Sequence, residues 1–157
     1  MPEAIHTAYK QYAIPVYTIS LVRDGVQRTT TSRVGSSVDA SAVLTQYLDG
    51  VDREHFVVLL LDQKSKIIGI HTVSIGSLTG SIVHPREVFK AAMLSNAASI
   101  ICGHNHPSGD PAPSYADKEM TIRLVTAGKL LDMPVVDHII IGDGTGRYMS
   151  FADEGLL

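Results

Sequence analysis

The chain has 157 residues, of which 45% are hydrophobic and 18% are charged, and its formal net charge is −3. This balance predicts one folded domain with a substantial core and excludes a disordered chain. The 13 lysines and arginines form no basic stripe, which argues against nucleic acid as the main partner, and no apolar stretch reaches the length of a membrane span.

Residues 1–35 are predicted to form an N-terminal lead-in that contains a possible β-hairpin. Residues 16–22 are rich in β-branched and aromatic residues, and Asp24-Gly25 is a favourable turn pair. Residues 27–33 would then be the returning strand. The lead-in could equally pair with another chain, and the sequence does not decide between the two.

Residues 36–157 are predicted to form the main domain, in which helical and extended patterns alternate. The first helix is predicted over residues 40–48, with Ser37 or Asp39 as its N-cap. Helices and strands then follow at 56–61, 67–75, 85–96, 99–102, 115–127 (stopped at Gly128), 135–141 and 148–151. Interleaved strands and helices predict the α/β class, with a mixed central sheet flanked by helices.

The residues that indicate chemistry lie between Ser99 and Asp117. His104 and His106 stand one residue apart at the end of an apolar strand, so their side chains point to the same side. A turn rich in proline and glycine follows, and Ser114 is a natural N-cap with Asp117 in the first helical turn. Two imidazoles, a carboxylate and a water would make an open four-coordinate zinc site, which is typical of catalysis.

A purely structural interpretation covers the same residues. His104 and His106 could be ordinary strand-end histidines, and Ser114 with Asp117 could be only a capping box. His-x-His alone is weak support for a metal site. The full string is more specific: His-x-His, seven residues, Ser, two residues, Asp. It resembles the signature of the JAMM (MPN+) metalloprotease fold.

Two longer segments resemble the RadC-like branch of that fold. They read VHPREVFKAAMLSNAASIICGHNHPSGDPAPSYAD and VVDHIIIGDG, and the resemblance covers roughly residues 51–157. It implies a JAMM/MPN-like architecture with a cytidine-deaminase-like layout, and His104, His106 and Asp117 as ligands of Zn²⁺. Full-length RadC-like proteins usually carry a helix-hairpin-helix segment. The residues before the resemblance are too few and show no such pattern, so we expect the short, single-domain form.

The predicted activity is zinc-dependent hydrolysis of an amide or isopeptide bond in a peptide or protein substrate. A carboxylate must take a proton from the metal-activated water. Glu54 is the predicted base, because members of the fold carry their catalytic glutamate at the head of a buried strand. Glu87 is the alternative, although it is also placed as a first-turn acid of a helix. Ser114 is predicted to hydrogen-bond the oxyanion or the water, as the motif implies.

Four nearby residues receive weaker predictions. Asp137 could orient a liganding imidazole through its second nitrogen, and His138 is predicted to be a packed histidine or one that supports a ligand from behind. Cys102 shares the parity of the two histidines but is more typical of a small buried hydrophobe. Asp110 is predicted to accept hydrogen bonds that fold the loop.

Two other functions stay open at this point. The RadC-like resemblance suggests a DNA-repair or DNA-processing factor. A metal ion that only holds the loop in its fold would instead make the chain a non-catalytic interaction module.

The single cysteine excludes an intrachain disulfide, and the N-terminus lacks the layout of a secretion signal, so we expect a cytoplasmic protein. The substrate, the oligomeric state and the role of residues 1–35 are not determined by the sequence.

Overall fold

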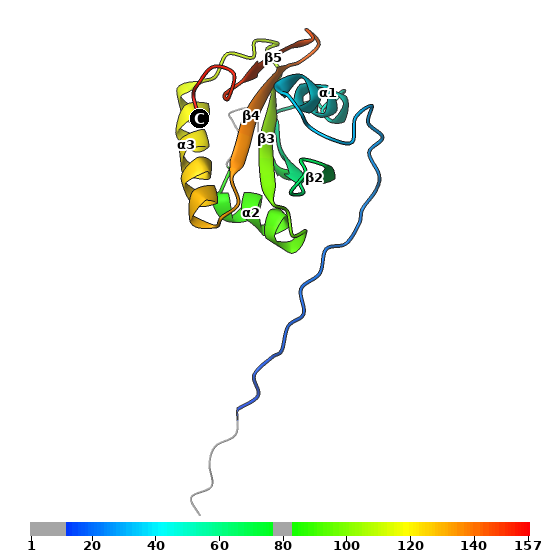
Figure 1. Ribbon diagram of the computed structural model, residues 1–157, viewed down its shortest axis with the longest axis vertical. Coiled ribbons are helices and arrows are strands. Elements are labelled where there is room, and N and C mark those ends of the chain that lie inside the picture. Colours follow the sequence, from blue (N-terminus) through cyan, green and yellow to red (C-terminus); the bar gives the residue numbers. More distant parts are fainter. Residues whose placement is uncertain (1–11, 77–82) are drawn as a thin grey trace, which may run out of the picture.

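A computed structural model of the chain describes residues 12–76 and 83–157 (Figure 1). Within these residues the elements are α1 (Ser37–Tyr47), β1 (His55–Leu61), β2 (Ile67–Ile75), α2 (Pro85–Leu94), β3 (Ser99–His106), α3 (Tyr115–Leu130), β4 (Val135–Gly142) and β5 (Arg147–Ser150). None of the described helices combines the length and the apolar character that crossing a membrane requires.

The strands form one mixed sheet in the order β2-β1-β3-β4-β5. β1 runs antiparallel to both β2 and β3, β3 and β4 are parallel, and β5 is antiparallel to β4. The predicted α/β class with a mixed sheet flanked by helices is therefore confirmed. β1 and β3 lie inside the sheet and are buried on both faces, which explains the nearly unbroken apolar run of β1 and the apolar first half of β3.

The helices divide between the two faces of the sheet. Successive side chains of a strand point to opposite faces, so Phe56 and Val57 of β1 enter different cores. Phe56 packs in the core that holds Phe89 of α2 and Leu124 of α3. Val57 packs in the core that holds Leu44 of α1. Residues of β3 with the parity of Cys102 thus face α2 and α3, and this places both histidines of the motif on that side.

Three helix ends differ from the prediction by two residues or more: α1 begins at Ser37 and not at residue 40, α2 ends at Leu94 and not at residue 96, and α3 ends at Leu130 and not at residue 127. The N-cap of α1 is Ser36, whose hydroxyl accepts from the N–H of Asp39, so the predicted cap at Ser37 or Asp39 is wrong. The Asp39 carboxylate reaches back to the N–H of Gly35 at 2.9 Å, which is why it sits inside the helix. α3 continues through Gly128, because that glycine serves close packing: a Cβ there would lie 2.6 Å from the carbonyl oxygen of Met133.

The residues of the lead-in that the structure describes form no hairpin, and pairing with another chain stays a prediction. Residues 12–32 contain no strand or helix and extend away from the domain (Figure 1). Their link to the sheet is a single antiparallel bridge between Arg33 and Lys66. A two-stranded hairpin without a surface to pack on is marginally stable at best in water, and here Val16 stays 95% exposed. Residues 1–11 lie outside the described part.

Candidate metal centre

The structure brings the three predicted metal ligands together at the carboxyl end of β3. His104 and His106 project from the strand, and Asp117 comes from the first turn of α3. One ligand atom from each lies within 4.8 Å of the others. The Nε2 atoms of the two imidazoles are 3.0 Å apart. The Asp117 oxygens lie 3.3 Å from Nε2 of His104 and 3.5 Å from Nε2 of His106.

The turn after β3 holds the ring of His106 in place. Gly109 has φ +81°, a backbone conformation that favours glycine, and its N–H returns to the carbonyl of His106 at 3.0 Å. The next residue, Asp110, presents its own carbonyl 2.8 Å from Nδ1 of His106. The Asp110 carboxylate accepts from the N–H of Ala112, so this residue folds the loop as predicted. A neutral His106 that donates from Nδ1 directs the lone pair of Nε2 into the cluster.

The carboxylate of Asp117 is fixed by a capping box at the start of α3. Its Oδ2 accepts from the N–H of Ser114 at 2.7 Å and from the hydroxyl of Ser114 at 2.6 Å. In return, the Ser114 hydroxyl oxygen accepts from the N–H of Asp117 at 3.2 Å. This geometry confirms the N-cap prediction for Ser114. The role of Ser114 at an oxyanion stays a prediction, because the capping box does not test it.

The charges and lone pairs of the cluster suit a cation at its centre. In the metal-free chain, the hydrogen bond with Asp117 raises the pKa of His106 against the opposing effect of burial, and the charge of Glu54 raises it further. Burial alone would raise the pKa of Asp117, but its contacts with His104 and His106 hold that pKa far below its ordinary value. With neutral imidazoles, lone pairs of nitrogen and carboxylate oxygen face one another, which is repulsive unless a positive charge lies between them. This donor set suits a divalent metal ion.

The register of the sheet places Glu54 beside the cluster. Phe56 of β1 pairs with His104 of β3 in antiparallel register, so residue 54 stands level with residue 106 when the ladder is continued. The rings of Phe56 and His104 stack with centroids 5.9 Å apart, which shows that they share a face. By alternation the side chain of Glu54 belongs to the same face, in agreement with its effect on the pKa of His106.

Asn105 clamps the backbone on both sides of Glu54. Its side chain is fully buried, and Oδ1 accepts from the N–H of His55 at 2.8 Å. Its Nδ2 donates to the carbonyl of Arg53 at 3.0 Å and to the Asp143 carboxylate at 2.8 Å. Sequence reasoning missed this residue. The available signal was its place between two histidines, where alternation turns its side chain to the opposite face.

The alternative base, Glu87, has a different environment. It lies in the first turn of α2, where it pairs with Lys90 at 2.5 Å, and both side chains are largely exposed. The hydrogen bond and charge of Lys90 lower the pKa of Glu87. Glu54 and not Glu87 is among the charges that raise the pKa of His106, and the choice of Glu54 as the base stays a prediction.

Two other sequence expectations are settled by burial and by hydrogen bonds. Cys102 is completely buried in the core, and burial raises its pKa to about 12, so it stays a protonated thiol as expected for a small hydrophobe. Asp137 does not orient an imidazole, and that prediction is wrong. Its carboxylate accepts from the hydroxyl of Ser150 at 2.6 Å and from the N–H of Ala152 at 3.0 Å, so it anchors the C-terminal segment instead.

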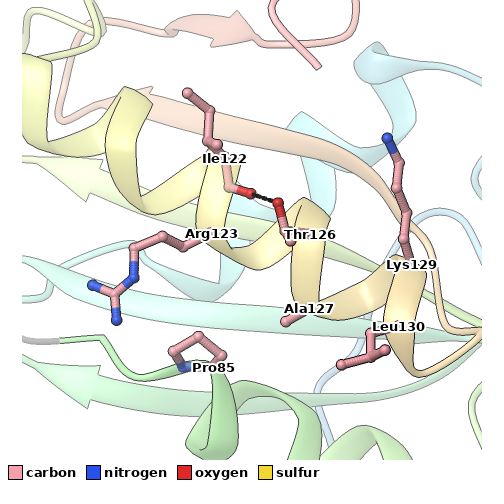
Figure 2. A pocket seen from close by; sticks show the side chains of 7 residues that line it. All are labelled: Pro85, Ile122, Arg123, Thr126, Ala127, Lys129 and Leu130. Carbon is pink, nitrogen blue, oxygen red and sulfur yellow. Dashed lines mark hydrogen bonds between the residues drawn. The ribbon is translucent and has the colours of Figure 1, made fainter.

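Access to the cluster is from the side of His106. The side chain of His104 is 0% exposed and that of Asp117 is 9% exposed, whereas that of His106 is 17% exposed. A separate apolar depression lies between α2 and α3, lined by Pro85, Ile122 and Leu130 among others (Figure 2). None of the three ligand residues lines this depression.

Comparison with known proteins shows which family the chain belongs to. A family model described as the RadC-like JAB domain matches residues 34–156. A UPF0758 protein of Caldanaerobacter subterraneus subsp. tengcongensis is 57% identical over 122 residues, which cover 78% of this chain and 52% of that protein. A UPF0758 protein of Methanosarcina acetivorans is 50% identical over 125 residues, which cover 80% of this chain and 54% of the relative.

A third relative, from Shouchella clausii, is 48% identical over 122 residues, 78% of this chain and 52% of its own length. The chain thus spans about half the length of the curated relatives it matches, and none of these three names specifies an activity. A model that matches most of the chain and relatives at this level of identity establish the family. The chain belongs to the RadC-like JAB domain family.

Proposed function

We propose that this chain is a zinc-dependent metallohydrolase that cleaves an amide or isopeptide bond in a peptide or protein substrate. The observation that carries the proposal is the convergence of two imidazole Nε2 atoms and one carboxylate. Glu54, whose charge raises the pKa of His106, is the proposed second carboxylate. Zinc is chosen because two nitrogen donors and one oxygen donor leave a fourth tetrahedral position for water, as in catalytic zinc sites.

The chain's own residues supply the remaining chemistry. His104, His106 and Asp117 would hold the metal ion, which supplies Lewis acidity and lowers the pKa of a neighbouring water to about 7. Glu54 accepts the proton of the attacking water and returns it to the departing amine nitrogen. Asn105 holds the peptide backbone on both sides of Glu54 against β3, so that the proposed base keeps a fixed position relative to the metal ligands.

Ser114 has two compatible roles in this proposal. Its hydroxyl completes the capping box with Asp117, which holds the ligand carboxylate in place. The same hydroxyl is proposed to stabilise negative charge on the substrate oxygen during attack, which requires its proton to turn away from Asp117. The capping role acts on stability and the second role on the rate, so the two can be measured separately.

The first experiment tests the metal centre. Elemental analysis of the purified full chain should find about one zinc per chain in the wild type and less than a tenth of that in His106→Ala and in Asp117→Asn. Glu54→Gln is the matched control, because Glu54 is not a ligand and its variant should keep the metal. Stoichiometric zinc that survives both ligand substitutions would show that the metal centre is assigned wrongly.

The second experiment tests catalysis with a library of fluorogenic peptide and isopeptide substrates. The zinc-loaded wild type should cleave members of the library, and Glu54→Gln should lose at least about 100-fold in kcat while it retains zinc. Glu87→Gln should behave as the wild type. A zinc-loaded wild type that cleaves nothing would favour the interaction module, and salt-dependent binding of duplex DNA would favour the DNA-processing alternative.

A further inference from the structure

Behind the metal cluster lies a buried chain of hydrogen bonds that the proposed chemistry does not use. It begins at Nδ1 of His104, which is 2.9 Å from Nε2 of His138 on β4. Nδ1 of His138 is 2.6 Å from the hydroxyl of Thr121 on α3. That hydroxyl is 2.6 Å from the main-chain carbonyl of Asp117. The side chains of His104, His138 and Thr121 are all shielded from solvent, with at most 1% of each residue exposed.

The number of protons fixes the direction of this chain. A carbonyl oxygen only accepts, so the single proton of the Thr121 hydroxyl must lie on the contact with Asp117. The Thr121 oxygen then accepts from Nδ1–H of His138. A neutral His138 with its proton on Nδ1 has a lone pair on Nε2, which accepts from Nδ1–H of His104. Three contacts use three protons, and the opposite direction would leave the contact between Thr121 and Asp117 without one.

The direction determines which nitrogen of His104 can bind a cation. With its proton on Nδ1, a neutral His104 carries its lone pair on Nε2, the atom that faces Asp117 and His106. Without a partner behind it, an imidazole can exchange the proton between its two nitrogens and lose this lone pair. The groups behind a ligand histidine commonly set both its tautomer and its ring orientation.

Aromatic packing holds the middle of the chain in place. The ring of His138 stacks on Phe151 with centroids 4.8 Å apart and an interplanar angle of 12°. Phe56 contacts the same ring edge-on at 5.5 Å and stacks on His104 at 5.9 Å. A flip of the His138 ring would put ring carbons in the places of both nitrogens and break both hydrogen bonds, so the packing and the proton order support each other.

We propose that Thr121 and His138 are positioning residues of the metal centre, which hold His104 in the tautomer whose Nε2 lone pair faces the metal ion. This series of hydrogen bonds begins and ends at the metal cluster, because Asp117 supplies both the main-chain carbonyl that accepts from Thr121 and a carboxylate that faces His104. The start of α3 and the tautomer of His104 are thereby coupled. This inference rests on the metal centre of the proposed function, although not on its hydrolytic step.

Thr121→Val tests the proposal, since it removes the hydroxyl and leaves a side chain of similar shape. We expect zinc affinity, measured by competition with a chelating indicator on the full chain, to fall about 10- to 100-fold. Thr121→Ser keeps the hydroxyl and should stay within about threefold of the wild type. Wild-type affinity in Thr121→Val would overturn the proposal.

A matched control separates this effect from a general change in α3. The hydroxyl of Thr126 donates to the carbonyl of Ile122 at 2.8 Å, the same bond to the preceding turn that Thr121 makes (Figure 2). Thr126 is exposed and does not take part in the hydrogen bonds behind the metal cluster. Thr126→Val should therefore leave zinc affinity unchanged. An equal loss of affinity in Thr121→Val and Thr126→Val would also overturn the proposal, because it would indicate a merely structural role.

The tautomer itself is measurable by long-range ¹H–¹⁵N NMR of the full chain labelled at histidine. His138 should carry its proton on Nδ1 in the wild type and lose that single form in Thr121→Val. A wild-type His138 with its proton on Nε2 would overturn the proposal whatever the zinc affinity. A wild type that binds no zinc would instead refute the proposed function, and the NMR result would then decide the inference alone.

Discussion

The close contact between β4 and the loop after β3 makes Gly142 a sensitive position that is not itself a ligand. Gly142 ends β4 and pairs with His106 in the parallel ladder. A Cβ built on it would lie 2.3 Å from the carbonyl oxygen of Gly109, although real Cβ contacts are essentially never under 3.0 Å. The same carbonyl accepts from Arg147 at 3.0 Å, so the loop is held from the other side as well.

The size of the effect of Gly142→Ala follows from these distances. The Gly109 carbonyl must move by about 0.7 Å, the difference between 3.0 and 2.3 Å. If Asp110 moves with it, the hydrogen bond from His106 to the Asp110 carbonyl lengthens from 2.8 Å toward about 3.5 Å, beyond the useful range. Overpacking of this kind costs about 1–3 kcal/mol in the free energy of unfolding, or roughly 5 °C in Tm for a chain of this size.

Thermal unfolding and zinc competition on the full chain measure the two consequences. Gly142→Ala should lower Tm and weaken zinc binding about 10-fold or more, because His106 loses the group that orients its ring. Gly69→Ala is the matched control: in β2 its Cβ would meet only the end of the flexible Leu60 side chain at 3.3 Å. If Gly142→Ala matches Gly69→Ala in both measurements, the reasoning about the loop is refuted.

Three further predictions concern the site. Asn105→Ala should lower kcat about 10- to 100-fold, with zinc content unchanged, because the backbone around the proposed base is no longer clamped; an unaltered kcat in steady-state kinetics would contradict this. Ser114→Ala should lower the free energy of unfolding by about 1 kcal/mol, because the helix N-cap is lost. A fall in kcat of about 100-fold or more would support the oxyanion role of Ser114, whereas an unchanged kcat would exclude it. Zinc competes with the proton on His106, whose pKa is raised in the metal-free chain. The affinity for zinc should therefore increase about tenfold for each unit by which pH rises toward that pKa, and level off above it. A Kd for zinc that does not change with pH would contradict this prediction. The raised pKa of His106 also contributes to the free energy of unfolding of the metal-free chain. This contribution is fully present below the ordinary histidine pKa of about 6.5, and it is lost as pH rises through the pKa of His106 in the folded chain.

Local patterns in the sequence were sufficient for most elements of the domain. The predicted strands at 67–75 and 135–141 agree with β2 and β4 within one residue, because both segments are rich in β-branched residues; β4 is almost wholly buried, whereas β2 is a partly exposed edge strand. Errors occurred where a contact from outside the segment decides the outcome. Gly128 reads as a helix stop, but it is required by the approach of Met133 after the helix has ended. Residues 16–22 read as a strand, but among the described residues no neighbouring strand pairs with them.

The candidate site was predictable to the extent that it is local in the chain. Strand alternation placed His104 and His106 on one face, and the capping pattern placed Asp117 in the first turn of α3. The partners behind these residues were only partly predictable. The sequence named His138 as a packed histidine or one that supports a ligand, but it did not single out Thr121, which α3 brings to His138. Asp137, the residue that sequence reasoning chose to orient an imidazole, turns instead to Ser150.

By itself, the sequence determined the α/β class, the three ligand-type residues and the family resemblance, since all of these depend on spacing along one segment. Only the tertiary structure decided that Phe56 lies opposite His104, that Asn105 joins β3 to the start of β1, and that His138 and Thr121 lie behind His104. Those properties depend on the register between strands and on the packing of α3 and β4 behind the site. Neither is encoded in the periodicity of any one segment.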